Sequence, residues 1–263
     1  MTKILKDKTN KVLLLMSFPI SLGMLSTFLF QVIDTYFIGQ LGPNALAALS
    51  FASTIYFILI SLYIGLSIGV SIIIGKSVGE GDLQKVKKTT WVSIVLSFLI
   101  SVLLTVVGIV FIDPFFIGLG AEGEVLPLIR EYTIPILVGM PLLTIGITSS
   151  GILRASGNIT KPEVVMAIAG ILNLVFDYVL IFGKWGFPAT GVKGAAYATV
   201  ISWVFVALGM VFLLLKDRLL SFTVKASISV RDIVREIFKL GSPTIVTQVV
   251  GPFTLMFLTF LLA

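Results

Sequence analysis

Residues 46–75 read LAALSFASTIYFILISLYIGLSIGVSIIIG, a run of thirty positions without a charged side chain. A helix needs about 20 mostly apolar residues to cross a lipid bilayer, so this run predicts a transmembrane helix. It is too long for a buried strand and shows no alternation of apolar and polar residues, which argues against a membrane β-barrel. The stretch therefore indicates an all-α membrane protein.

Apolar runs of similar length lie on both sides, separated by turn residues such as those at 39–44 and 79–82. Six runs are complete and a seventh is still apolar at the last residue: 12–38, 46–75, 89–112, 125–149, 163–183, 191–215 and 237–263. We expect a polytopic six-helix transmembrane lobe over 1–215, a cytoplasmic linker over 216–236 and the start of a seventh transmembrane helix over 237–263. Because the sequence ends inside an apolar run, we also expect a missing or separate C-terminal lobe as a partner.

The composition excludes most classes of soluble protein. Hydrophobic residues make up 57% of the chain and charged residues 12%, whereas soluble domains have about 45–50% and about 25%. The chain has no Cys and no His, which excludes thiolate nucleophiles, Ser-His-Asp triads and zinc sites. The net charge is +6, but the basic residues flank apolar runs and form no nucleic-acid-binding patch. We therefore expect no enzyme, no cofactor and no nucleic-acid partner.

The basic residues predict the orientation of the chain, because cytoplasmic loops carry an excess of Lys and Arg. One side of the predicted spans has 16 of the 19: Lys3, Lys6, Lys8, Lys11, Lys76, Lys85, Lys87, Lys88, Arg154, Lys161, Lys216, Arg218, Lys225, Arg231, Arg235 and Lys239. The other side has Arg130, Lys184 and Lys193. We expect a multi-pass protein of the cell membrane with a cytoplasmic N-terminus.

Two acidic residues lie inside predicted spans, where a charge costs roughly 2.5–3.5 kcal/mol on insertion scales. Asp34 shares a helix face with Thr27 and Gln31, which predicts a polar stripe that faces a cavity. Asn173 and Asp177 are four residues apart and share a face of the fifth span. Both carboxylates lie about 8–9 Å from the outer ends of their helices at about 1.5 Å per residue.

Oxygen ligands at matched depth suit a proton or a hard cation, so Asp34, Asn173 and Asp177 are candidate ligands for Na⁺ or H⁺ as the coupling ion. The alternative is a structural hydrogen-bond cluster that fixes helix packing. Tyr132 either contributes a hydroxyl to this cluster or is an ordinary interfacial tyrosine. Pro19 is either a hinge that responds to Asp34 or a static bend.

Small residues predict one close helix contact. Gly65 and Gly69 form a G-x-x-x-G pattern, which usually lets two membrane helices approach closely. The 20 Phe residues give no comparable signal, because the sequence does not indicate which of them line a substrate pocket.

Three motifs in this order resemble the multidrug and toxic compound extrusion (MATE) family of transporters: DTYFIGQLG at 34–42, GILRASG at 151–157 and NLVFDY at 173–178. The resemblance implies twelve helices in two lobes and export of organic, often cationic compounds in exchange for Na⁺ or H⁺. It also implies an ion site formed by Asp34, Asn173 and Asp177. By the same resemblance Tyr132 and Thr199 join the site, and Pro19 corresponds to the family's first-helix proline.

We therefore interpret the chain as the N-terminal half of a cation-coupled antiporter that exports drug-like molecules. Two alternatives stay open. One is a flippase of lipid-linked precursors, although such proteins usually have a strongly basic cavity and the intramembrane charges here are acidic. The other is a membrane remnant that transports nothing.

Overall fold

The computed structural model describes residues 9–221 and 229–262, and within these residues every regular element is a helix. The helices are α1 (Thr9–Gly39), α2 (Pro43–Gly79), α3 (Leu83–Val110), α4 (Ile112–Gly118), α5 (Val125–Ala155), α6 (Thr160–Phe182), α7 (Val192–Lys216) and α8 (Val230–Leu262). Seven of them, all except α4, are long and apolar enough to cross a membrane. The predicted all-α membrane fold is confirmed.

The turn residues that separate the apolar runs begin and end these helices. Pro43 opens α2, after Gly42 with a positive φ of 112°, and proline is well suited to a first helical position. Asp82 caps α3 by accepting a hydrogen bond of 2.9 Å from the Lys85 backbone N–H. Gly183 ends α6 in the left-handed conformation.

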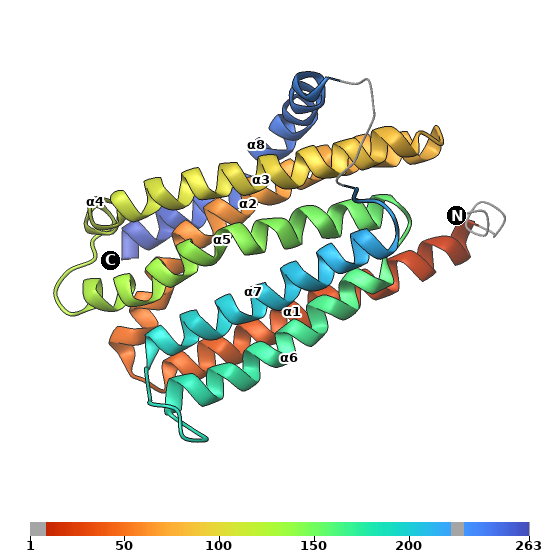
Figure 1. Cartoon of the computed structure of the whole chain (residues 1–263). Helices are drawn as coiled ribbons and strands as arrows, with labels where there is room; N and C mark the ends of the chain where they lie inside the picture. Colours follow the sequence, from red (N-terminus) through yellow and green to blue (C-terminus); the bar gives the residue numbers. More distant parts are fainter. Residues whose placement is uncertain (1–8, 222–228, 263) are drawn as a thin grey trace.

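The long helices run alongside one another, and their connections alternate between the two ends of the bundle (Figure 1). We call the end that holds the start of α1 and the α2–α3 turn the inner end, and the opposite end the outer end. The most buried of the long helices is α5, which packs against α2, α3 and α7, and the least buried are α1 and α8. In the described part of α1, Ile38 is the one fully buried side chain.

The six complete runs correspond to α1, α2, α3, α5, α6 and α7, and the seventh run to α8. Two details differ from the sequence-based prediction. The short helix α4 was not predicted, because its seven residues are too few to give a periodic signal. The last helix begins at Val230 and not near 237, because the polar start of this segment has apolar residues on one face. Residues 222–228 of the predicted linker lie outside the described residues.

The G-x-x-x-G pattern of α2 lies where α8 crosses it. A Cβ atom at Gly69 would come within 2.8 Å of the backbone N of Gly241, and one at Gly65 would come within 2.7 Å of the Cα of Ile245. Real Cβ atoms essentially never come that close, so only glycine permits this contact between two backbones. The close packing predicted from the pattern is confirmed, and its partner is the segment that follows the linker.

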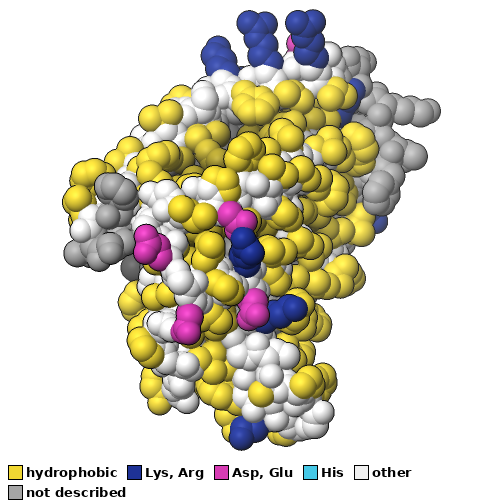
Figure 2. All heavy atoms as spheres, turned by 90° about the vertical axis from the view of Figure 1, so that its left-hand side faces the viewer, with side chains coloured by type: hydrophobic (Ala, Val, Ile, Leu, Met, Phe, Trp, Pro, Cys, Tyr) yellow, Lys and Arg dark blue, Asp and Glu magenta, His cyan; other side chains and the backbone are white. Residues whose placement is uncertain are grey.

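Each end of the bundle has its own polar contacts. At the outer end, which Figure 2 faces, acidic side chains lie beside basic ones, and Asp113 accepts two hydrogen bonds from Arg130. At the inner end, Asp217 accepts hydrogen bonds from Lys161 (2.9 Å) and Asn158 (2.5 Å). The contact with Lys161 is the main reason why the pKa of Asp217 is lowered from its usual value.

Candidate functional site

A cavity of about 300 Å³ lies between the helices of the bundle. Its walls combine aromatic rings with amide, hydroxyl and carboxyl groups, a composition typical of sites for small molecules. The lining residues come from five helices: α1 (Thr27, Phe30, Gln31, Asp34, Thr35), α2 (Leu49, Ser53, Tyr56, Phe57, Ile60), α5 (Tyr132, Ile136), α6 (Met166, Ala169, Gly170, Asn173) and α7 (Thr199, Ser202, Trp203, Val206).

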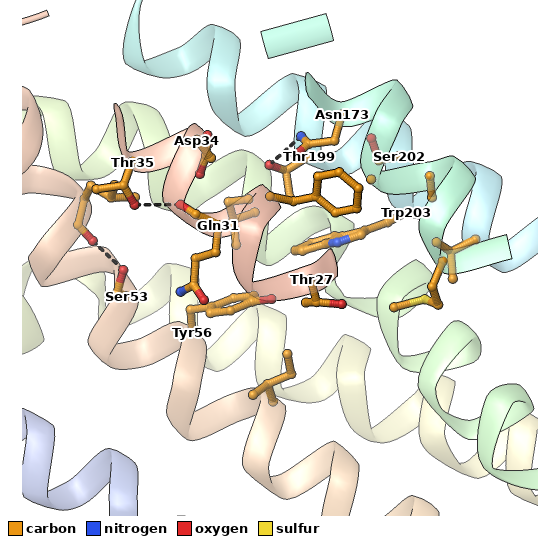
Figure 3. Close-up of a pocket in the computed structure, with 18 of the residues that line it drawn as sticks. Thr27, Gln31, Asp34, Thr35, Ser53, Tyr56, Asn173, Thr199, Ser202 and Trp203 are labelled. Atoms are coloured by element: carbon orange, nitrogen blue, oxygen red, sulfur yellow. Dashed lines mark hydrogen bonds between the residues drawn. The ribbon is translucent and has the colours of Figure 1, made fainter. Parts of the chain in front are cut away.

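The polar stripe of α1 forms one wall of this cavity. Thr27, Gln31 and Asp34 all line it, as the helical spacing predicted (Figure 3). One carboxylate oxygen of Asp34, Oδ1, is buried and has no hydrogen-bond partner. A buried acceptor without a partner carries the full cost of its lost hydration, so Asp34 offers a free oxygen to a proton or cation.

Asn173 and Asp177 face this region from α6. Asn173 lines the cavity and donates a long hydrogen bond of 3.5 Å to Thr199 Oγ1 on α7 (Figure 3). Asp177 lies one helical turn further on, is 0% exposed, and has no hydrogen-bond partner at either carboxylate oxygen. It is not among the residues that line the cavity, yet it is close enough to Asp34 for the two charges to interact. The helices α1 and α6 thus bring two incompletely partnered carboxylates together.

Tyr132 and Thr199 complete the predicted set. Tyr132 is buried on α5, lines the cavity, and is close enough to interact with the charges of Asp34 and Asp177. Thr199 lines the cavity as the acceptor for Asn173. Pro19 belongs to α1, but its side chain lies outside the described residues, so its role as a hinge stays a prediction.

A glycine on α6 sets the distance between the two helices that carry the acids. A Cβ atom at Gly170 would collide with the ring of Phe30 on α1. Phe30 and Gly170 both line the cavity, close in sequence to Gln31 and Asn173 respectively. The absence of a side chain at Gly170 therefore lets α1 pack against α6 next to the polar groups.

Several cavity residues were not identified from the sequence: Ser53, Tyr56, Ser202 and Trp203. The rings of Tyr56 and Trp203 are nearly parallel, with an interplanar angle of 7° and centroids 6.3 Å apart. The sequence alone does not predict that these residues line a cavity. The helices α2 and α7 are apolar on all sides, and their aromatic residues do not lie on one face.

The site is suited to binding a small hard cation or a proton. Carboxylate, amide and hydroxyl oxygens are the ligands that such ions prefer, whereas transition metals favour His and Cys. Within the described ranges, no group of three or more His, Cys, Asp or Glu side chains could hold a metal ion. The arrangement is thus two carboxylates supplemented by Asn173, Thr199 and Tyr132.

Comparisons with known proteins find one family. The MatE family model matches residues 19–179. A FAD transporter of Shewanella oneidensis is 38% identical over 218 residues, which cover 82% of this chain and 48% of that protein. A probable multidrug resistance protein NorM of Thermotoga maritima is 32% identical over 174 residues, 66% of this chain and 38% of the relative.

A solved structure gives the same result. The outward-facing conformation of a multidrug resistance MATE family transporter of the MOP superfamily superposes with a TM-score of 0.85 at 29% identity, covering 94% of this chain and 54% of that one. The chain thus spans about half the length of these proteins or less.

Proposed function

Because the chain belongs to the MatE family, whose members are transporters and not enzymes, we propose that it forms the N-terminal half of an exporter driven by Na⁺ or H⁺. The exporter is complete when a C-terminal lobe joins it. Its location is the cell membrane, with the inner end of the bundle in the cytoplasm. This orientation agrees with the excess of Lys and Arg at the inner end.

The observation that carries this proposal is the pair of incompletely partnered carboxylates beside the cavity. An ionised carboxylate is costly inside a membrane, and Asp34 and Asp177 together are costlier because like charges repel. A captured Na⁺ or proton offsets both costs. The ion-bound and ion-free bundles then favour different access states, and substrate competes with the ion for one of them.

The cavity supports a cationic or amphipathic organic substrate. Aromatic rings from Phe30, Tyr56, Phe57 and Trp203 provide apolar contact area and faces that attract cations. Among the described residues that line the cavity, Asp34 is the acidic one and none is Lys or Arg. This charge balance opposes a lipid-linked pyrophosphate, the cargo of the flippase alternative.

The test is ion-coupled efflux in cells that lack their own multidrug exporters. The chain is expressed together with a C-terminal lobe supplied on a second polypeptide, and ethidium efflux is followed under imposed Na⁺ or pH gradients. We expect Asp34→Asn to reduce coupled efflux at least about ten-fold while the protein still inserts.

Glu122→Gln is the matched control, because Glu122 is an exposed acid in the outer α4–α5 connection and away from the cavity. Normal efflux by the Asp34→Asn variant contradicts the coupling mechanism. If neither the unchanged chain nor any variant gives efflux when the C-terminal lobe is supplied, the result supports the alternative of a remnant that transports nothing.

A second candidate is export of a flavin nucleotide, because the relative with 38% identity is named a FAD transporter. The parallel rings of Tyr56 and Trp203 favour a planar aromatic group, but the cavity offers the pyrophosphate no cation among its described lining residues. FAD uptake by inverted vesicles that carry both lobes distinguishes the two candidates. Uptake of FAD without uptake of ethidium favours the flavin nucleotide.

A further inference from the structure

The first turns of α8 have two chemically different faces. Ile233 and Ile237 point into the bundle and are 1% and 0% exposed. Arg231, Arg235 and Lys239 follow one another at intervals of four residues, so they share the opposite face, and all three are exposed. We call these three residues the α8 basic stripe.

The stripe lies at the inner end of the bundle. Ile233 and Ile237 belong to one core cluster with Val86 near the start of α3, Leu153 near the end of α5 and Leu219 after α7. All three of these neighbours are close to inner helix ends. Figure 1 shows the first turns of α8 beside α3 at the margin of the bundle, and the rest of α8 passing behind α3 and α2 toward the outer end. An amphipathic helix with this placement is typical of a membrane–water interface.

The charges of the stripe are available to a partner. The ion pairs among the described residues involve other basic side chains, namely Lys76, Arg130, Arg154 and Lys161. The acids Asp232 and Glu236 lie on the adjacent side of the helix and form no ion pair with the stripe in this part of the chain. The upper edge is the same in Figures 1 and 2, and α8 begins near it in Figure 1. Lys and Arg side chains project from this edge in Figure 2.

Exposed apolar side chains accompany the cations. Phe238 follows on the same side as the stripe and is 43% exposed, and Val230 at the start of the helix is 50% exposed. Apolar groups beside Arg and Lys suit the boundary between headgroups and acyl chains. They do not suit a surface that faces bulk water.

We propose that the α8 basic stripe binds the phosphate groups of anionic lipids in the inner leaflet. Each Lys or Arg near an anionic membrane surface contributes roughly 1 kcal/mol of attraction. The lipid would hold the segment that leads from the first lobe into α8 against the membrane. This inference goes beyond the transport activity and depends only on the inner end facing a leaflet that contains anionic lipid.

The test measures lipid selectivity of the 263-residue chain in vesicles of phosphatidylcholine and phosphatidylglycerol. Spin-labelled versions of each lipid report the fraction held at the protein surface. We expect the triple variant R231Q/R235Q/K239Q to lower the preference for phosphatidylglycerol at least about five-fold, and high salt to reduce the preference of the unchanged chain.

Two control variants separate the stripe from general charge. Lys184→Gln with Lys193→Gln removes exposed cations at the outer end and should leave the preference unchanged. Asp232→Asn with Glu236→Gln removes the neighbouring acids and should maintain or raise it. Lys184, Lys193 and Asp232 are exposed and Glu236 is half-buried, so none of these substitutions alters a fully buried side chain.

Three outcomes overturn the proposal. The first is an unchanged preference in the triple variant, and the second is an equal loss when only the outer lysines are changed. The third is displacement of the lipid by millimolar glycerol 3-phosphate, which indicates a site for soluble phosphate. Absence of efflux even when the C-terminal lobe is supplied, together with an unchanged lipid preference, supports this inference while contradicting the proposed function.

Discussion

At the scale of single residues, the two buried acids have different surroundings. Asp34 borders the cavity, whereas Asp177 is fully enclosed behind it. Under the proposed coupling mechanism, an ion that enters the cavity would therefore meet Asp34 first, and Asp177 would act on it mainly through its charge. Asn173 connects α6 with Thr199 on α7, so in the proposed ion site a displacement of Asn173 would also act on a third helix.

Asp217 at the inner end gives a pH-dependent prediction. Because the folded-state pKa of Asp217 is lowered, its ionised carboxylate stabilises the protein at pH values above the unfolded-state pKa of 3.8. This contribution disappears as the pH falls through the folded-state pKa. We expect Asp217→Asn to cost about 1 kcal/mol of stability near pH 7. The difference from the unchanged chain should shrink as the pH falls below 3.8, as measured by thermal unfolding in detergent.

Lys161→Gln provides the matched comparison, because Lys161 is the partner that lowers the pKa of Asp217. The double variant should lose less than the sum of the two single losses. Strictly additive losses at neutral pH mean that the contact between Lys161 and Asp217 contributes nothing to stability.

At the scale of helices, close packing of α1 on α6 depends on Gly170. We expect Gly170→Ala to cost about 1–3 kcal/mol, because the new methyl group collides with Phe30 and the core must rearrange. The separation of α1 and α6 should also weaken Na⁺ or substrate binding. Thermal unfolding and binding isotherms measure the two effects.

Gly39→Ala at the end of α1 is the control, because a Cβ atom there would meet nothing within 4 Å. It should change stability little and binding not at all. Equal losses in the two variants would contradict the Phe30 contact as the cause, because alanine has a higher helix propensity than glycine and does not by itself destabilise a helix.

Helix positions were largely predictable from the sequence, because bilayer thickness imposes a minimum length on every apolar run. The acids Asp34 and Asp177 were identifiable because a charge inside an apolar span is costly and therefore rare. Neither the aromatic cavity wall nor Gly170 was predictable. Their roles depend on which helices become neighbours, and helices that are apolar on all sides carry no signal for that.

At the scale of the whole molecule, the proposed orientation can be tested directly, since the chain has no Cys. Gln84 near the start of α3 and Lys184 in the α6–α7 connection are both exposed and lie at opposite ends. We expect a membrane-impermeant maleimide to label Lys184→Cys in intact cells. Gln84→Cys should react only after the cells are permeabilised, and the reverse pattern contradicts the proposed orientation.

The weak attachment of α1 has a consequence for the energetics of ion capture. Its side chains Phe18, Met24 and Phe28 are more than half exposed, while α5 is enclosed by its neighbours. Segments with few buried contacts undergo local unfolding at low free-energy cost, so amide hydrogens of α1 should exchange faster than those of α5. Asp34 therefore lies on a loosely packed helix. Under the proposed coupling mechanism, capture of one small cation at Asp34 would change how strongly α1 is held in the bundle.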